Sequence, residues 1–420
     1  MTPHPSMIRA RSARFSGASR TDHWASRGAA VLGAVVALAT TGACSSSSTA
    51  HSSPLVIVVA APRATSPWVA DFMAHGAQLG ARDAAPGRPI RVDVVTADTA
   101  SEVANAARTA ASEHALALIT DGTATDAVDA ITEPAHVPVF VVYSGAEDAV
   151  DAARFPHVYR VAPADHPMAI HLADYVSAHH PKVALVVEAT PYGRAGAAQL
   201  RAAFARDSIP VVAAAEVTTT VGPAPALVSA RGKGADTLVV WGSAPLITQT
   251  ITAARGAGWA PAIYTSPDGE DPYVRRQLAQ HPAWVDGLTF VTGRVTSEQG
   301  SAPYEKFRAA YTKEFGVENL GVTDGGRPVT LPPTWAQYPY DTVRLVAAAY
   351  ANAGAAGAPL LTALDTTVVT GANGDERGFT DGNREGVIGD DVCFERFHGL
   401  RFAPVTDDVL LQGLPSIDQG

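Results

Sequence analysis

Continuous apolar runs recur along this chain of 420 residues, and a stretch with helical spacing follows each of them. A strand that is buried on both faces has such a run, which is typical of parallel sheets covered by helices. The first run is Leu55–Ala60, and further strands are predicted at Ile90–Thr96, Ala115–Thr120, Val137–Tyr143, Lys182–Val187, Pro210–Val217, Thr237–Trp241, Ala262–Thr265 and Leu288–Thr292. Since one ordinary sheet does not hold so many strands, we expect an α/β fold with two Rossmann-like lobes joined by several crossovers.

Two of the helices between these strands contain residues that predict how the helix packs or where it begins. The helix after the first strand contains Gly76 and Gly80, and we expect these glycines to let it pack close to the sheet. A second helix is predicted over Asp165–Ala178, with Asp165 as a structural N-cap and Pro167 in the first turn.

The C-terminal third interrupts this rhythm. Gly316–Pro333 is rich in glycine and proline and is predicted to be a long surface loop. In the Gly- and Asp-rich tail, Val392–Phe397 is the only strand-like segment between Gly371 and Gly399. The predicted domains are a signal peptide (1–43), a lipidated cysteine with a flexible tether (44–54), a first lobe (55–161 plus 294–390) and a second lobe (162–293 plus 391–420).

The N-terminal region has the features of an export signal. Residues 1–43 carry five arginines and one acid, and the uncharged apolar stretch Gly28–Ala43 is shorter than the roughly 20 residues of a membrane span. The sequence Thr41-Gly42-Ala43-Cys44 resembles the bacterial lipobox, although Thr41 stands where the lipobox usually has leucine. We therefore expect a lipoprotein, acylated at Cys44 (a palmitate-type anchor) and held on the outer face of the cell membrane.

The remaining cysteine and the net charge argue against a disulfide-stabilised protein and against a nucleic-acid-binding protein. If Cys44 is acylated, Cys393 is the only cysteine left and no intramolecular disulfide can form. Cys393 lies in an apolar-alternating run and is predicted to be a small buried core residue. The net charge of −10 gives no electrostatic reason to bind nucleic acid.

Short stretches in a fixed order carry a resemblance to a known family. They are Val158–Asp165, Lys182–Val187 with Pro191-Tyr192-Gly193, Thr237–Gly242, Tyr264–Gly269, Tyr304–Phe307 and Tyr340-Asp341. Together they resemble the type I periplasmic binding proteins, in particular the leucine/isoleucine/valine-binding branch. Nearly the whole mature chain is covered by this resemblance.

The resemblance implies that a small ligand binds between the lobes, beyond the carboxyl ends of the strands. On the first lobe, Thr123 and Thr125 belong to a loop that would hold a ligand carboxylate, and Ser144 and Gly145 belong to a second such loop. Ala146 stands where the family commonly has a hydroxyl residue. Turn chemistry alone also explains these residue types.

Across the cleft, the resemblance aligns Tyr192 with a tyrosine that packs on the ligand and Asp268 with an acid that pairs with its ammonium group. Asp268 also fits an ordinary Pro-Asp-Gly surface turn. Ser243 falls where the amino acid binders often have a bulky aromatic, which favours a larger ligand. Trp68 is a candidate wall of the pocket or a core residue.

The implied function is capture of an amino acid, amide or related compound for an ABC-type uptake system. Its partners would be the ligand, a membrane permease and, through the lipid anchor, the membrane; no cofactor and no metal are implied. An enzyme is disfavoured, because the sequence has no His-Glu-x-x-His, Cys-x-x-Cys or Gly-x-Ser-x-Gly motif. An envelope lipoprotein that senses a ligand or regulates a partner remains the alternative.

Overall fold

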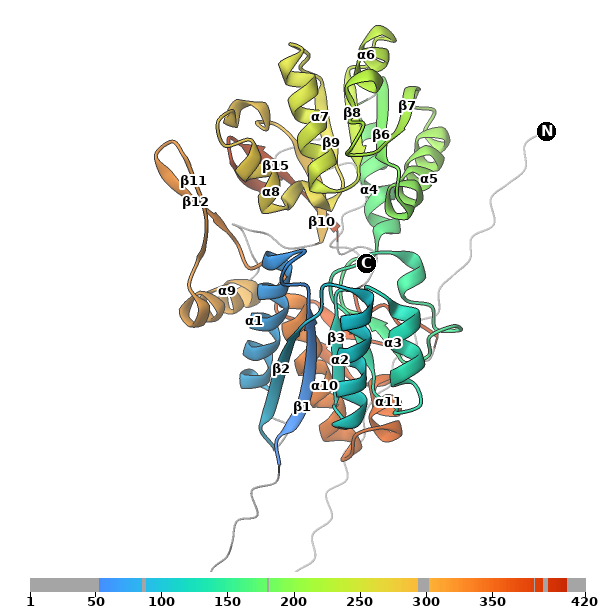
Figure 1. Ribbon diagram of the computed structural model, residues 1–420, viewed down its shortest axis with the longest axis vertical. Helices are drawn as coiled ribbons and strands as arrows, with labels where there is room; N and C mark the ends of the chain where they lie inside the picture. Colours follow the sequence, from blue (N-terminus) through green and yellow to red (C-terminus); the bar gives the residue numbers. More distant parts are fainter. Residues whose placement is uncertain are drawn as a thin grey trace, which may run out of the picture. The chain divides into compact units, whose positions relative to one another are not determined.

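The computed structural model describes residues 53–84, 88–179, 181–293, 302–380, 382–387 and 392–405. The predicted signal peptide, the acylation site Cys44 and most of the tether lie outside the described residues, as does much of the hinge segment after Gly293. Within the described chain, two main sheets confirm the predicted α/β fold (Figure 1). The exact lobe boundaries stay a prediction.

The first sheet is parallel, with the strand order β2-β1-β3-β4-β5. Its strands are β1 (Leu55–Ala61), β2 (Ile90–Thr96), β3 (Ala117–Thr120), β4 (Val139–Val141) and β5 (Val158–Arg160). Each strand except β2 is almost wholly buried, as the unbroken apolar runs predict.

The second sheet has the order β16-β15-β10-β9-β8-β6-β7. Its strands are β6 (Val183–Glu188), β7 (Val211–Val217), β8 (Thr237–Trp241), β9 (Ala262–Thr265), β10 (Thr289–Gly293), β15 (Val392–His398) and β16 (Arg401–Pro404). Strands β6 to β10 are parallel, whereas β15 pairs antiparallel with both β10 and β16. The end of the chain therefore completes a sheet that began two hundred residues earlier.

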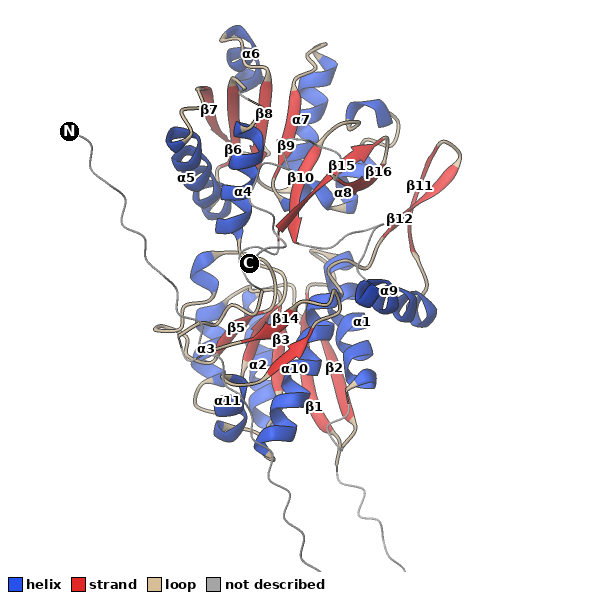
Figure 2. Ribbon diagram, turned by 180° about the vertical axis from the view of Figure 1, so that it is seen from behind, coloured by secondary structure: helices blue, strands red, loops and turns tan. Residues whose placement is uncertain are grey.

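Helices cover both faces of each sheet (Figure 2). They are α1 (Pro67–Asp83), α2 (Ala100–Ser112), α3 (Thr125–Thr132), α4 (Asp165–Ser177), α5 (Pro191–Arg206), α6 (Ala224–Gly232), α7 (Ala244–Gly256), α8 (Pro272–Gln277), α9 (Ala302–Phe315), α10 (Gln337–Ala353) and α11 (Ala358–Leu364). Short 3-10 helices lie at η1 (Glu147–Ala149), η2 (Pro267–Glu270) and η3 (Pro282–Trp284).

Alternate residues of a strand pack against different helices, as the pleat requires. In β1, Val58 belongs to the same buried cluster as Val103 of α2, whereas Ile57 clusters with Phe72 of α1. In the second sheet, residues of β6 alternate in the same way between a cluster with α4 and α5 and a cluster with α6 and α7. Each sheet is thus a middle layer between two helical layers.

The two glycines of α1 serve a helix contact and not the predicted sheet contact. A Cβ on Gly76 would lie 2.2 Å from the carbonyl oxygen of Ala336, and one on Gly80 would lie 2.7 Å from that of Tyr340. Both oxygens belong to the start of α10 or the residue before it. The prediction that the two glycines allow close packing was right, but they pack against α10 and not against the sheet. The sequence does not show that α10 returns to this face.

The predicted loop Gly316–Pro333 is instead a β-hairpin of β11 (Glu318–Asp324) and β12 (Arg327–Leu331). Its turn is Gly325-Gly326, and both glycines have positive φ, as a tight two-residue hairpin turn requires. The tail also contains more strands than predicted, since β13 (Val368–Thr370) pairs with β14 (Glu376–Gly378).

Two further predictions on single residues were wrong. Asp165 does not cap α4: it is the first helical residue, and the N-cap Ala164 has no side chain that could accept. Cys393 is only half-buried, and its thiol lies 3.2 Å from the carbonyl oxygen of Gly293. Alternation in β15 puts Val392 and Phe394 in the core and turns Cys393 to the other face.

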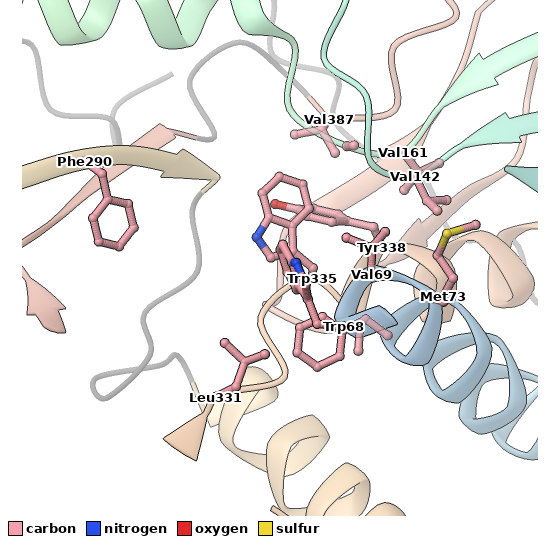
Figure 3. Close-up of a cluster of buried hydrophobic side chains, with 14 of the residues drawn as sticks. Trp68, Val69, Met73, Val142, Val161, Phe290, Leu331, Trp335, Tyr338 and Val387 are labelled. Carbon is pink, nitrogen blue, oxygen red and sulfur yellow. The ribbon is translucent and has the colours of Figure 1, made fainter. Parts of the chain in front are cut away.

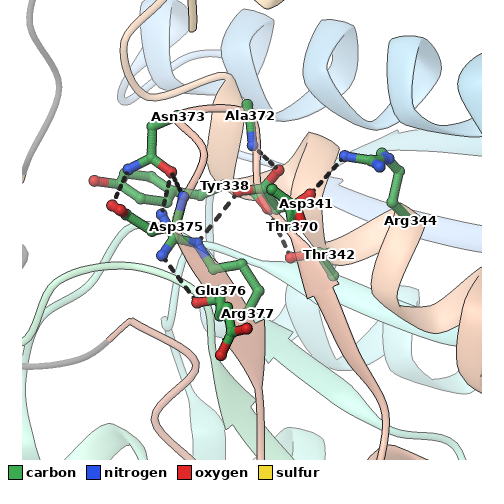
Figure 4. A network of polar contacts seen from close by, with 10 residues as sticks. All are labelled: Tyr338, Asp341, Thr342, Arg344, Thr370, Ala372, Asn373, Asp375, Glu376 and Arg377. Carbon is green, nitrogen blue, oxygen red and sulfur yellow. Dashed lines mark hydrogen bonds and ion pairs between the residues drawn. The ribbon is translucent and has the colours of Figure 1, made fainter. Parts of the chain in front are cut away.

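A buried ion pair ties the tail to α10 (Figure 4). The guanidinium Nε of Arg377 lies 3.3 Å from Oδ2 of Asp341, and both side chains are almost inaccessible to solvent. The backbone N–H of Ala372 donates to the other oxygen of Asp341 at 2.7 Å, and Arg377 also donates to Asn373. Burial nevertheless raises the pKa of Asp341 to about 6, with Arg377 opposing the shift.

No single helix in the described part of the chain has the length and apolar character of a membrane span. Helices α10 and α11 meet the criterion together, but a bend of 115° separates them.

Candidate functional site

A cavity of ≈ 320 Å³ lies where strands of both sheets end. Its described lining is Trp68, Asp121, Gly122, Thr123, Tyr143, Ser144, Gly145, Ala146, Asp165, Met168, Tyr192, Pro267, Asp268 and Trp335. Loops after β3, β4 and β9 contribute to it, together with the first turns of α1, α4 and α5. The carboxyl ends of parallel strands are where open α/β sheets bind ligands.

Two larger hollows lie elsewhere. One, of ≈ 590 Å³, is lined by α9, the β11–β12 hairpin and Arg275. The other, of ≈ 650 Å³, is more open and lies beside Arg160 and Glu385. The first has no lining residue from the loops directly after β3, β4 and β9, and the second takes only Glu147 from the segment after β4, so position in the fold favours the smaller cavity.

The loop after β3 is organised by Asp121. Its carboxylate accepts the backbone N–H of Thr123 at 2.8 Å and the Thr123 hydroxyl at 3.0 Å. Burial raises the pKa of Asp121, and these hydrogen bonds oppose the shift. The donors that the sequence assigned to a ligand carboxylate are therefore engaged by a carboxylate of the chain itself.

Arg160 holds the loop after β4 in place through hydrogen bonds to its backbone. This buried guanidinium donates to the carbonyl oxygens of Ser144 at 3.2 Å and Ala146 at 2.7 Å, and its Nε donates to Glu385 at 2.8 Å. The Ser144 hydroxyl in turn accepts the N–H of Ala146 at 3.3 Å. Arg160 is a positioning residue that sequence reasoning placed in a family stretch but not in the site.

On the second lobe, Tyr192 and Asp268 are in contact. The Tyr192 hydroxyl donates to Oδ2 of Asp268 at 2.8 Å, and the Ser266 hydroxyl lies 3.3 Å from the same oxygen. Desolvation raises the pKa of Asp268 to about 6, and the hydrogen bond from Tyr192 opposes that shift. The two residues predicted for this side of the cleft thus form one unit.

Asp165 places a second carboxyl group near Asp268. It lies at the start of α4, and its backbone N–H donates to the carbonyl of Gly145 at 2.8 Å. A Cβ on Gly145 would lie 2.2 Å from Oδ1 of Asp165, so only glycine allows this approach. Burial, followed by the charge of Asp268, raises the pKa of Asp165 to about 7.

Aromatic rings form the wall on the side of α1 and α10. The ring of Tyr143 lies 5.8 Å from that of Trp68 and 5.1 Å from that of Trp335, both edge-on. Figure 3 shows Trp68 and Trp335 beside each other in the buried cluster. Their indole N–H groups are used elsewhere, since Trp68 donates to Asp271 at 3.2 Å and Trp335 to Glu270 at 3.0 Å.

Glu270 is a buried junction between segments far apart in the sequence. It accepts the hydroxyls of Thr334 at 2.8 Å and Thr292 at 3.2 Å in addition to the indole of Trp335. Desolvation raises its pKa, and these donors oppose the shift. Glu270 follows β9 of the second sheet, whereas Trp335 precedes α10, so this carboxylate links the two lobes.

The structure brings together six of the eight predicted ligand residues, which are Trp68, Thr123, Ser144, Gly145, Tyr192 and Asp268. The other two, Thr125 and Ser243, do not line this cavity. Thr125 begins α3 and its hydroxyl donates to the carbonyl of Gly122 at 3.2 Å. Ser243 donates from its N–H and its hydroxyl to Glu188, each at 2.9 Å.

Sequence reasoning missed Tyr143, Asp165 and Trp335 as lining residues. Tyr143 ends a predicted strand, so its place at a strand end was an available signal. Asp165 stands in the family stretch but was assigned to capping. Trp335 comes from a segment remote from every other lining residue, and no local pattern points to it.

Comparison with known proteins decides the family. The family described as periplasmic binding protein matches residues 64–388, which is most of the chain. The chain belongs to the periplasmic binding proteins. A search of curated protein sequences found no match.

Solved structures show which form of the periplasmic binding fold this is. A leucine-binding protein, LivK, from Thermotoga maritima has a TM-score of 0.69 at 18% identity, covering 84% of this chain and 98% of its own. An ABC transporter substrate-binding protein from Desulfitobacterium hafniense, in complex with leucine, has a TM-score of 0.67 at 18% identity, covering 84% of this chain and 100% of its own.

A third similar structure carries a different ligand. It is a solute-binding protein of an ABC transporter from Rhodopseudomonas palustris, in complex with 3,4-dihydroxybenzoic acid, with a TM-score of 0.67 at 17% identity, covering 83% of this chain and 95% of its own. These likenesses confirm the type I periplasmic binding fold. One fold therefore accepts both an amino acid and an aromatic acid, so the fold alone does not determine what a periplasmic binding protein binds.

Proposed function

We propose that this protein is an exported, lipid-anchored solute-binding component of an ABC-type uptake system, which captures a small compound with an amino group. The observation that carries the proposal is the cavity lined from both lobes, with the Tyr192–Asp268 pair on one side. A desolvated carboxylate forms a strong charge-assisted hydrogen bond with an ammonium group. Amino acids, their amides and related amines are the compounds that supply one.

Capture requires that the ligand touch both lobes. A ligand shifts the population toward the closed form only if it binds that form better, and contacts with Thr123 or Ser144 on one side and Asp268 on the other provide this difference. Closure would turn on the crossovers near Val161 and Gly293. The closed form would then dock on a membrane permease, and no chemistry on the ligand is needed.

The proposal is tested with residues 45–420, which keep every described element. A thermal-shift screen against amino acids, amides, short peptides and sugars should show a hit, since a ligand at 100 times its dissociation constant adds about 2.7 kcal/mol of stability. A screen without any shift would favour a lipoprotein that regulates a partner and leaves its cleft unused. Mass analysis of the mature N-terminus tests acylation of Cys44.

Asp268→Ala tests the ammonium contact directly. We expect it to weaken an amine-bearing hit by about 2 to 5 kcal/mol, the cost of removing one partner of a buried charge pair. Asp148→Ala is the matched control, because Asp148 is an exposed aspartate outside the cavity. An unchanged dissociation constant for Asp268→Ala, measured by calorimetry, would exclude this role of Asp268.

A further inference from the structure

The charge of the cavity is one-sided. Asp121, Asp165 and Asp268 line it, and no lysine, arginine or histidine is among its described lining residues. Two further acids lie just behind the aromatic wall, where Asp271 and Glu270 accept the indole N–H groups of the tryptophans. An anionic group entering this space would meet several like charges at short range in a poorly solvated site.

Several donors of the loops that would have to hold a ligand carboxylate are engaged within these loops. Thr123 gives both its N–H and its hydroxyl to Asp121, and the N–H of Ala146 is donated to the Ser144 hydroxyl. The N–H of Ser144 is donated to the carbonyl oxygen of Asp121. The carboxylate of Asp121 thus takes the place that the family resemblance assigns to the ligand carboxylate. A ligand carboxylate beside Asp121 would be repelled.

The environment of the Asp165 carboxyl group points to a bound cation. Its carboxyl group lines the cavity together with Asp268 and is only partly accessible to solvent, and among the described residues no side chain forms a hydrogen bond or an ion pair with it. The nearby Arg160 is directed to Glu385 and to the backbone of the loop after β4. Partial desolvation of an acid without a partner is costly, and a ligand cation removes that cost.

The rest of the lining also suits a cation. Trp68, Tyr143, Tyr192 and Trp335 are lining residues, and both tryptophans have committed their only donor to an acid outside the cavity. What they offer to a ligand is ring surface, and the electron-rich face of an aromatic ring attracts ammonium groups. Carboxylates combined with aromatic rings recognise positive charge and apolar substituents together.

We propose that the cleft selects small organic ammonium compounds that lack a carboxylate, with Asp121 on one side and Asp165 and Asp268 on the other. This inference rests on the proposed function, because it assigns a ligand class to the same cavity. It departs from the amino acid expectation at the first lobe, where Asp121 replaces the ligand's acidic group.

The test compares ligands that differ only in the acidic group, on residues 45–420 by calorimetry. Leucine, phenylalanine and arginine are each measured beside the amine left by removal of the carboxyl group, and glycine betaine is measured beside choline. We expect at least one amine or choline to bind ten-fold tighter than its zwitterionic partner. Equal or tighter binding of the zwitterions would overturn the inference and leave the proposed function intact, whereas no binding of any probe would overturn both.

Two variants test the assigned carboxylates. Asp121→Ala removes the internal carboxylate and frees both donors of Thr123, so the preference for the amine over the amino acid should fall at least ten-fold. Asp165→Asn should weaken the amine ten-fold or more and leave the amino acid less affected. Asp148→Ala, an exposed change, is the control for each, and an unaltered preference in Asp121→Ala would contradict the role of Asp121.

Discussion

Asp165→Asn should remove a pH-dependent part of the stability of the unliganded protein. In the folded chain burial raises the pKa of Asp165 to about 7, and the charges of Asp268 and Glu147 add to the shift while Arg160 opposes it. In an unfolded chain an aspartate has a pKa of about 3.9. Between these values the native protein holds a proton that the unfolded chain has released, so the free energy of unfolding falls as the pH rises.

The size of the effect follows from the pKa difference. Each unit corresponds to 1.36 kcal/mol, so a difference of about 3 units destabilises the native state by about 4 kcal/mol once the pH is above 7. About 1.5 kcal/mol of this is already present at pH 5. Between pH 5 and pH 8 the wild type should therefore lose about 2 to 3 kcal/mol through Asp165, and the uncharged asparagine should not.

Urea denaturation followed by tryptophan fluorescence at pH 5, 6, 7 and 8 measures this difference. The wild type and Asp165→Asn share every other titrating group, so the gap between their unfolding free energies isolates Asp165. The gap should change in favour of the variant by about 2 to 3 kcal/mol across the series. Asp148→Asn, at an exposed site, should run parallel to the wild type.

Parallel curves for Asp165→Asn and the wild type would refute the reasoning. They would mean that Asp165 carries the same charge in the folded and unfolded chains over this range. Its burial against Gly145 would then not be the environment described above.

Three other substitutions have expected outcomes. Glu270→Gln should lower the urea unfolding free energy by about 1 to 3 kcal/mol, because one amide oxygen replaces two carboxylate oxygens that accept from Trp335, Thr334 and Thr292; equal stability would show that this junction is not needed. Asp341→Ala should cost about 3 to 5 kcal/mol in the same assay because it removes the buried carboxylate that pairs with Arg377, and a smaller loss would mean that the other partners of Arg377 or water satisfy the guanidinium. Gly76→Ala should cost about 1 to 3 kcal/mol, since its Cβ would meet the backbone before α10; a thermal midpoint equal to that of the wild type would disprove the tight contact.

The strands could be predicted because burial on both faces leaves a local trace. Thr237–Trp241 and Ala262–Thr265 are strands with the predicted bounds, and so is the edge strand Ile90–Thr96, although it is only partly buried. The hairpin of β11 and β12 was missed because its strands carry polar residues, although Asp324-Gly325-Gly326 is a turn signal. Glycine and proline content alone misled the prediction there.

The candidate site could be predicted where it depends on strand ends and not where it depends on packing. Thr123, Ser144 and Asp268 follow strands, so their place at the cavity could be derived from topology. Trp335 reaches the cavity only because α10 returns to the first sheet. The engagement of Thr123 by Asp121 depends on the loop conformation, and no spacing in the sequence determines it.

The return of β15 to the second sheet has a consequence for how the chain can be cut. Strand β10 is flanked by β9 on one side and by β15 on the other, and about a hundred residues separate β10 from β15 in the sequence. A chain that stops before β15 would leave β10, with its buried apolar residues, as an open sheet edge, and such edges pair with other chains. A product that stops before β15 is therefore not a self-sufficient fragment and is expected to aggregate where the full chain folds.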